Sequence, residues 1–323
     1  MVQRRKSKFA DLKDRAWRAA TDWSMEVASQ PLPTPIHELA RLHKVQAVRF
    51  EPLLSTAGLM KGDDGYVIVS NTEAVGAPQD AGATLEADSR WDNFEPPFRF
   101  TLAHEICHLF FSDGRGLAGK QYFVRHHAQL EKACNEMAGL ILMPKQRLVS
   151  EIGDRPFATS HLKSVTHRFR VSPEVFVRRL KINDIQDAFG GLDGLIALIR
   201  AEGETFSIVA SHFWGVYARS RFQMTPRLRQ NNHEVNSKQS NDPASWQIRD
   251  FHLGIDVDTV LRSSDYWEEK LPVRCKHKLE LPCEFNACLT GLRPRTFIIS
   301  IQVLGPPIKR EDTGKGDALL FPG

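Results

Sequence analysis

Two histidines and the glutamate beside the first of them are the side chains of this sequence best suited to chemistry, in the stretch His104-Glu105-Ile106-Cys107-His108. On a helix, residues four apart lie one turn above each other, so both imidazoles can face a single cation. Zinc favours tetrahedral coordination by neutral imidazole, with one position left for water. Zinc-bound water loses a proton near neutral pH, and Glu105 is placed to accept that proton and pass it to a leaving amine. The motif predicts a zinc peptidase site with His104 and His108 as ligands and Glu105 as the catalytic residue.

The alternative interpretation is a surface helix with two exposed histidines and a solvated carboxylate. The residues that flank the motif argue against it, because they are apolar on most sides of the helix: Phe100, Leu102, Ala103, Ile106, Leu109 and Phe110. Such a helix is expected to be buried, and buried polar groups need partners. A metal ion would be that partner.

Two histidines leave a third protein ligand to be found downstream. The candidates are the carboxylates and imidazoles that follow the motif: Asp113, His126, His127, Glu131 and Glu136. Glu131 and Asn135 share a helical stripe that borders the expected core stripe. Glu136 lies about 140° around that helix from Glu131, so the two cannot both serve. Asp113 follows the motif too closely to fold back easily. Spacing alone favours Glu131 and leaves the other candidates open.

The elements that must position these side chains are helices beside a small sheet. Periodicity and turn signals predict them as helices over 9–29, from Thr34-Pro35, over 98–111 and over 129–143, strands at AVRFEPL and GYVIVS, and a loop over 71–97. The histidines stand on the third of these helices and Glu131 on the fourth.

The stretch RFTLAHEICHLFF followed by LEKACNEMAGLILMP resembles the ImmA/IrrE family of metallopeptidases, and the likeness covers roughly residues 33–145. In that family a His-Glu-x-x-His helix precedes a helix that reads Glu-x-x-x-Asn. The resemblance implies His104 and His108 as metal ligands and Glu105 as the catalytic residue. It also implies Glu131 as the third ligand, with Asn135 as the asparagine that follows.

The sequence departs from the family at Cys107, where members often have glycine, and at Met137-Ala138-Gly139, where they often have Phe-Ala-Ala. Neither departure removes a ligand. Cys107 and Cys134 are expected to be small packed residues rather than ligands.

The layout of the chain resembles the IrrE branch of the family, the radiation-response regulators. The expected fold is α+β, divided into a zincin-like helical peptidase domain with a small sheet (1–147), a helix-turn-helix-like segment (148–188), a GAF-like α/β sensor domain (189–310) and a flexible tail (311–323). A change from helical patterns to short apolar runs near residue 190 fits this layout.

The middle of the chain, 158–182, resembles a helix-turn-helix in which Ser172 caps the second helix and Pro173 opens it. The side chains of that helix are expected to divide into a core set and a partly exposed basic set: Val175, Phe176 and Leu180 against Arg178, Arg179 and Lys181. Segment 145–187 holds nine Lys/Arg and five Asp/Glu. This surface suits weak DNA contact through 158–182, and it suits docking of a protein substrate equally well.

Composition sets limits on the class of protein. The chain has 323 residues, a net charge of +4, and no apolar run that would serve as a secretory signal or membrane span. Its five scattered cysteines indicate a reducing, cytoplasmic setting. The spacing of Cys275, His277, Cys283 and Cys288 does not match structural zinc pairs, so these cysteines are expected to be reduced residues in or near strands.

The resemblance implies a zinc-dependent, site-specific endopeptidase that cleaves a helix-turn-helix transcriptional repressor and so releases stress or DNA-damage response genes. The metal in the cell could be manganese, because imidazole and carboxylate ligands accept several divalent ions. Candidate donors to the oxyanion are Tyr122, His126 and His127, although a structural role is the expectation for each. A GAF-like domain would offer a pocket for an unknown small ligand.

The alternative function is a DNA-binding or protein-binding transcriptional regulator with a structural or vestigial metal site. Intact Glu105 counts against it, because a structural site does not need that carboxylate.

Overall fold

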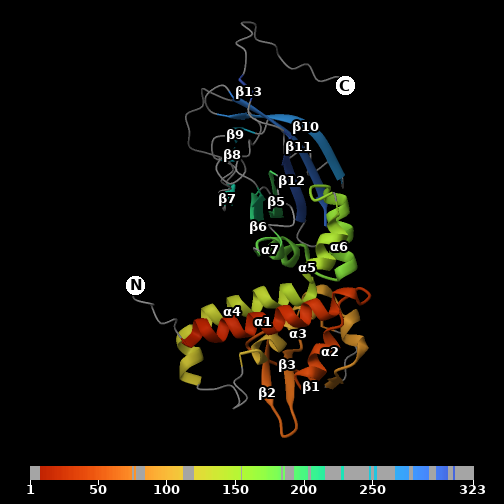
Figure 1. Cartoon of the computed structure of the whole chain (residues 1–323), viewed down its shortest axis with the longest axis vertical. Coiled ribbons are helices and arrows are strands. Elements are labelled where there is room, and N and C mark those ends of the chain that lie inside the picture. The colour runs from red at the N-terminus through yellow and green to blue at the C-terminus, as the bar shows by residue number, and fades with distance from the viewer. Residues whose placement is uncertain are drawn as a thin grey trace. The chain divides into compact units, whose positions relative to one another are not determined.

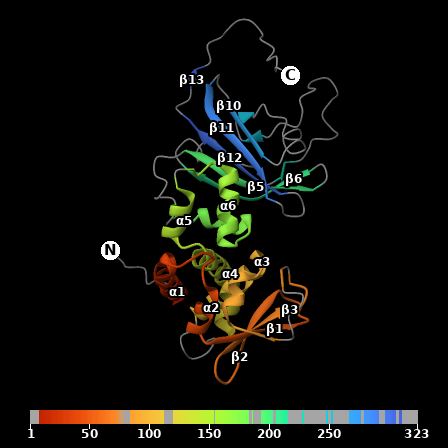
Figure 2. The same cartoon turned by 90° about the vertical axis from the view of Figure 1, so that its right-hand side faces the viewer.

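The computed structural model describes these residues of the chain: 8–74, 76–77, 84–111, 120–153, 155–182, 185, 193–202, 205–214, 227–228, 247–248, 251–252, 266–275, 279–290, 296–304 and 308–309. The chain divides into two compact units, residues 1–189 and 190–323, drawn in Figures 1 and 2. The expected tail at 311–323, together with Asp113, His277 and the side chain of Tyr122, lies outside the described residues.

A four-stranded sheet in the first unit has the order β2-β3-β1-β4. At its centre β1 (Val45–Glu51) and β3 (Tyr66–Asn71) lie parallel, and β2 (Ala57–Lys61) and β4 (Thr84–Glu86) pair antiparallel at its edges. The central strands are those that AVRFEPL and GYVIVS predict, and they bury β-branched residues such as Val48 and Ile68. The residues of the edge strands are exposed or half-buried, so these strands lack the buried apolar residues by which a strand is predicted. β4 lies in the segment predicted as loop.

The first helix packs against α4 (Lys120–Leu142), and the second packs against α3 (Pro96–Leu109) and the small sheet. α1 (Lys8–Glu26) runs into a 3-10 turn, η1 (Val27–Ser29), and together they match the helix predicted over 9–29. α2 (Ile36–Leu42) starts later than predicted, since Pro35 occupies the cap position and Thr34 does not cap. The buried Thr34 hydroxyl instead donates to the carbonyl of Leu142, 3.0 Å away, at the end of α4.

α3 and α4 pack against each other inside the first unit. α3 is buried on most of its circumference by its apolar residues, which include Phe98, Leu102, Ala103, Ile106 and Leu109. α4 begins earlier than predicted and buries the expected stripe of Leu130, Cys134, Met137 and Ile141. The burial of α3 excludes the interpretation of its motif as part of a solvated surface helix.

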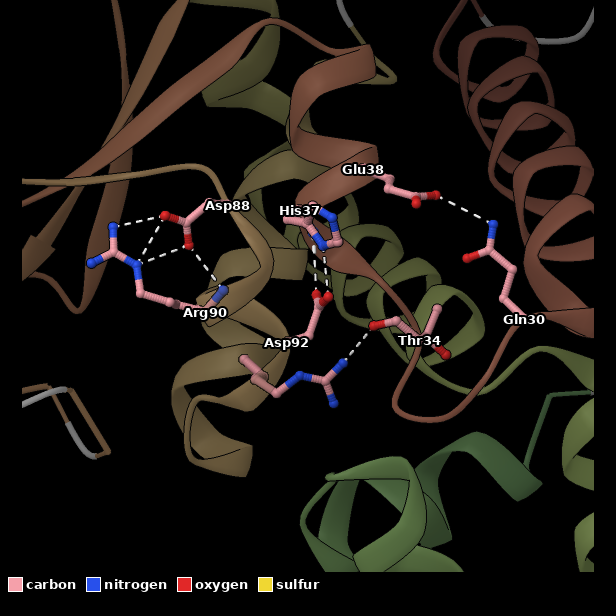
Figure 3. Close-up of polar contacts among 8 residues, drawn as sticks. Gln30, Thr34, His37, Glu38, Asp88, Arg90 and Asp92 are labelled. Carbon is pink, nitrogen blue, oxygen red and sulfur yellow. Dashed lines mark hydrogen bonds and ion pairs between the residues drawn. The ribbon is translucent and has the colours of Figure 1, made fainter.

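A polar cluster holds the segment that leads into α3 (Figure 3). In the 3-10 turn η2 (Ser89–Asn93), the carboxylate of Asp88 caps the turn by accepting from the backbone N–H of Arg90 at 2.9 Å. Asp92 Oδ2 lies 2.6 Å from Nδ1 of His37 on α2, and burial raises the pKa of the Asp92 carboxyl. These contacts fix the approach to the helix that carries the histidines.

Three short helices follow α4 in the same unit: α5 (Lys145–Ile152), α6 (Thr159–Phe169) and α7 (Pro173–Leu180). The predicted start of α7 is confirmed, because the Ser172 hydroxyl accepts from the N–H of Val175 at 3.3 Å and Pro173 is the first helical residue. α6 ends at Arg170, whose backbone is left-handed with φ 51°.

Two buried arginines tie these helices to the rest of the unit. Arg99 of α3 donates to the carbonyls of Phe169, at the end of α6, and of Thr34, each at 2.7 Å. Arg179 of α7 donates to the carbonyl of Met143, 3.1 Å away, just past α4. The prediction that Arg179 is partly exposed is therefore wrong. Carbonyls at a helix end need donors from outside the helix, and the buried Arg179 supplies one.

The second unit holds a nine-stranded antiparallel sheet. Its long strands, in the order β6-β5-β12-β11-β10, are β5 (Gly194–Glu202), β6 (Thr205–Trp214), β10 (Tyr266–Cys275), β11 (Leu279–Leu289) and β12 (Thr296–Val303). Its short strands are β7 (Arg227–Leu228), β8 (Gln247–Ile248), β9 (Phe251–His252) and β13 (Ile308–Lys309). Cys275, Cys283 and Cys288 lie on β10 and β11.

Helices together with sheets are compatible with the expected α+β class. The GAF-like layout of the second unit, the helix-turn-helix-like character of 148–188 and the domain limits at 147 and 188 stay predictions. None of the helices described is long and apolar enough to cross a bilayer.

Candidate metal centre

Three side chains from α3 and α4 converge on one point. His104 and His108 face the same side of α3, with their Nε2 atoms 3.2 Å apart. From α4, the carboxylate of Glu131 lies 3.1 Å from His104 Nε2 and 3.4 Å from His108 Nε2. Ligand atoms that surround a tetrahedral ion at about 2.1 Å lie about 3.4 Å from one another. The three side chains therefore fit a single divalent cation.

The hydrogen bond on the far side of His104 decides which ring nitrogen faces that point. Nδ1 of His104 lies 3.0 Å from Oδ1 of Asn135, one turn after Glu131 on α4. An amide oxygen only accepts, so this contact favours a proton on Nδ1, and in that tautomer Nε2 presents its lone pair to the centre, as metal ligation requires. A lone pair that faces both a carboxylate and a second imidazole needs a positive centre between them, which a metal ion would supply.

His108 also presents a lone pair. Burial lowers the pKa of His108 to about 4, with the charge of His104 acting in the same direction. At neutral pH its ring is uncharged, which is the form that binds metal. The donor set of two imidazoles and one carboxylate is found at catalytic zinc sites, which keep a further position for water.

Glu105 lies beside these atoms without facing solvent. Its side chain is buried, and its carboxylate is within 4.8 Å of the ligand atoms of both histidines. Burial raises the pKa of Glu105 to about 7, and the nearby charge of Glu131 raises it further. A carboxylate whose pKa is near neutral can both accept and return a proton at physiological pH. Among the described residues, no second cluster of this kind occurs.

A cleft of about 550 Å³ leads to the centre. One wall is β2 with the turn before it, and the other is formed by α3 and α4; the lining includes Ala57, Gly58, Leu59, Phe100, Thr101 and His127. β2 is an edge strand, so its outer backbone groups are not used by the sheet. This wall is not predicted from the sequence, because the AGLMK segment lacks the alternation of apolar and polar residues that identifies a strand.

The remaining candidates for third ligand lie elsewhere or at the rim. His126 stacks on Phe9, with ring centroids 4.8 Å apart, and Glu136 faces Lys13. His127 is largely exposed and lines the cleft, with Nε2 3.8 Å from the Glu131 carboxylate. Of the candidates described, only Glu131 lies close to both motif histidines.

Cys107 and Cys134 are buried and have free thiols. Burial raises the pKa of each thiol well above its ordinary value, so neither is a thiolate at neutral pH. Both pack as small core residues between the helices, as their sequence context predicts.

Part of the chain is similar to a known family of proteins. Residues 93–181 match the family model of the Peptidase_M78 IrrE N-terminal-like domain, a segment that includes α3, α4 and the helices through α7. This match confirms the resemblance to the ImmA/IrrE peptidases for that part of the chain. No curated protein matches the chain. Among solved structures, a Mycobacterium tuberculosis transcriptional regulator is similar over 92% of this chain and 81% of its own, with 12% identity and a TM-score of 0.45.

Proposed function

We propose that the chain is a zinc-dependent, site-specific endopeptidase that cleaves a helix-turn-helix transcriptional repressor and thereby releases stress-response or DNA-damage response genes. The observation that carries the proposal is the convergence of His104, His108 and Glu131 beside a buried Glu105. The family match of residues 93–181 supports the peptidase class, and the family resemblance supports the kind of substrate.

His104, His108 and Glu131 would hold the metal, which when bound would polarise the scissile carbonyl and acidify a water. Glu105, buried beside these side chains, would act as the base that takes a proton from the attacking water and as the acid that delivers it to the leaving nitrogen. His127, exposed at the mouth of the cleft, is placed to donate a hydrogen bond to the developing oxyanion. Asn135 keeps the His104 ring in the tautomer that ligation needs.

The substrate would enter as an extended chain. The outer edge of β2 borders the cleft and can form main-chain hydrogen bonds with a segment laid beside it. A chain that binds through its backbone is held across the catalytic residues without its ends being recognised. This arrangement suits cleavage within a protein.

The competing function is a DNA-binding or protein-binding transcriptional regulator whose metal site is structural or vestigial. A closed structural site has four protein ligands, whereas this centre has three and a buried carboxylate beside them. The basic residues of α7 also support DNA binding less than the sequence suggests, because Arg179 is buried and Arg178 lies 2.8 Å from Glu174.

The test is a comparison of wild-type protein with Glu105→Gln, which keeps the shape of the side chain and removes the base. Both proteins are expected to bind one equivalent of zinc. Only the wild type is expected to cut the helix-turn-helix repressor encoded nearest its gene, as followed by mass spectrometry of the fragments. Repeating the assay with manganese shows which metal supports the reaction. Equal relief of repression by both proteins in cells would instead establish the regulator.

A further inference from the structure

A second hollow adjoins the metal cleft and is larger, about 1440 Å³. It is bordered by α1, α4, α7 and the first turns of α3, all within the first unit. Phe100 and Glu131 line this hollow and the metal cleft alike, so the two are neighbours. The chemistry assigned to the metal centre does not use the larger hollow, which is called the helix groove here.

The residues that α4 contributes to the helix groove lie on one face of that helix. They are spaced at intervals of three and four: Ala128, Glu131, Lys132, Asn135, Glu136 and Gly139. With a rise of 1.5 Å per residue, this face is about 16 Å long. It starts at Ala128, about two turns after the first residue of α4, and it is exposed or half-buried as far as Glu136, whereas Gly139 is buried against Arg179.

The other two sides of the groove, formed by α1 and α7, are also single helix faces. α1 contributes Lys13, Asp14, Trp17 and Arg18, and α7 with the residues just after it contributes Glu174, Val175, Arg178, Lys181 and Ile182. Each set again has the three- and four-residue spacing of a single helix face. Figure 1 shows α1 running along α4, with α7 on another side of α4. The helix groove is thus bordered by three helix faces, and an α-helix about 10 Å wide is the element that such a space accommodates.

The charged residues that line the helix groove indicate the kind of helix that would bind there. Arg18, Lys132 and Arg178 are exposed cations at its rim, whereas Trp17 and Phe100 provide apolar surface further in. Glu136 is the shared carboxylate for Lys13 and Lys132, each 3.9 Å away. Arg178 also has a partner, Glu174, 2.8 Å away. Outside the metal centre the exposed and half-buried charges that line the groove are five cations and three carboxylates, so the lining retains positive charge: Lys13, Arg18, Lys132, Arg178 and Lys181 against Asp14, Glu136 and Glu174. An acidic face on the incoming helix would complete the pairing.

We infer that the helix groove docks an amphipathic, acidic α-helix of about three turns that belongs to the protein substrate. This inference rests on the proposed function, because it assigns to that same substrate a binding site separate from its scissile bond. Docking at the helix groove brings the rest of the substrate near β2 and the metal centre, because the groove and the metal cleft share Phe100 and Glu131 in their linings. Selection of one protein then depends on a folded feature rather than on the cleaved residues alone.

The experiment measures binding of the repressor to the full chain carrying Glu105→Gln, so that cleavage does not interfere. Adding Arg18→Glu and Arg178→Glu is expected to weaken binding at least tenfold in 0.1 M salt, with a smaller difference in 0.5 M salt, because exposed charges are screened. The matched control is Arg15→Glu, on the same helix as Arg18 but outside the groove, which should bind as the parent does. Unchanged binding in the double variant would overturn the inference.

A cross-link identifies the docked segment. A photoreactive benzoylphenylalanine in place of Ala128, which is exposed and lines the groove, is expected to cross-link to a helical, acidic segment of the repressor, distinct from the segment that contains the scissile bond. Attachment to the scissile segment, or competition by a duplex DNA probe for the same face, would contradict the inference. Because both measurements use the Glu105→Gln chain, they read docking even if the repressor is never cut, and loss of docking leaves the cleavage result standing.

Discussion

His104 illustrates how a metal centre depends on groups that do not touch the ion. Its Nδ1 lies beside Asn135 and its Nε2 faces Glu131 and His108, so a single helix, α4, supplies both the proposed third ligand and the residue that would orient the first. The i, i+4 spacing of Glu131 and Asn135 places both on one side of α4. At the residue scale the centre therefore depends on two pairs of residues with i, i+4 spacing, His104 and His108 on α3 and Glu131 and Asn135 on α4.

Replacing Asn135 tests that arrangement. Asn135→Leu is expected to lower zinc affinity about 10- to 100-fold, because the His104 ring loses the acceptor that fixes its tautomer. Asn135→Asp keeps an acceptor at this position and should restore most of the affinity. Competition with a chromophoric chelator measures both. Equal affinity in the wild type and the leucine variant would show that the hydrogen bond does not orient the ligand.

The raised pKa of Glu105 predicts a pH dependence of stability in the metal-free protein. The folded protein keeps this proton up to about pH 7, whereas the unfolded chain releases it near 4.5. Stability contributed by this group is therefore highest in acid and falls as pH rises from about 4.5 to 7. The loss corresponds to about 3 kcal/mol, using about 1.4 kcal/mol for each pKa unit.

Glu105→Gln cannot ionise, so it should lack this loss. Urea unfolding of the two metal-free proteins between pH 5 and 8 is expected to show the variant gaining on the wild type as pH rises. A difference in free energy that stays constant over this range would mean that Glu105 is not desolvated in the fold.

At the scale of elements, α6 and α7 are joined to the helices of the metal centre through buried arginines. Arg99 reaches from the start of α3 to the end of α6, and Arg179 reaches from α7 to the end of α4. Desolvation lowers the pKa of Arg99 to about 10, and it remains a cation at neutral pH. A charged group held in a buried position needs each of its hydrogen bonds, so these helices act as supports for α3 and α4.

Arg179 and Arg178 form a matched pair for testing this support, because they are neighbours on α7 and only Arg179 is buried. Arg179→Leu is expected to lower the free energy of unfolding by about 2 kcal/mol, since the carbonyl of Met143 loses its donor. Arg178→Leu removes an exposed pair with Glu174 and should cost less than about 1 kcal/mol. Chemical denaturation measures both, and equal losses would contradict the assignment.

At the scale of the whole molecule, the proposed catalytic residue, the metal cleft and the helix groove all belong to residues 1–189. A protein ending after residue 189 is therefore expected to fold, to bind one zinc ion and to cut the repressor. Circular dichroism, metal analysis and the cleavage assay check the three properties. A truncated protein that folds but binds no zinc would show that the second unit contributes to the centre.

The same truncation tests the sensor role predicted for residues 189–310. If a small ligand bound there controls access to the site, the full chain responds to the cellular signal and the truncated chain cuts constitutively. Full and truncated proteins that cut equally under every condition would leave the second unit without a sensing role.

The sequence determined the parts of this protein that depend on neighbours along the chain. The four-residue spacing of His104 and His108 and the cap at Ser172 follow from helical geometry, and the burial of α3 follows from its apolar flanks. Tertiary structure decided what depends on contacts between distant segments. It showed that Glu131 lies within contact distance of the histidines, that Arg179 is buried with its guanidinium at the end of α4, and that β2 forms a wall of the cleft. Spacing within one helix does not specify which face of another helix it meets, so only the packed structure supplies that information.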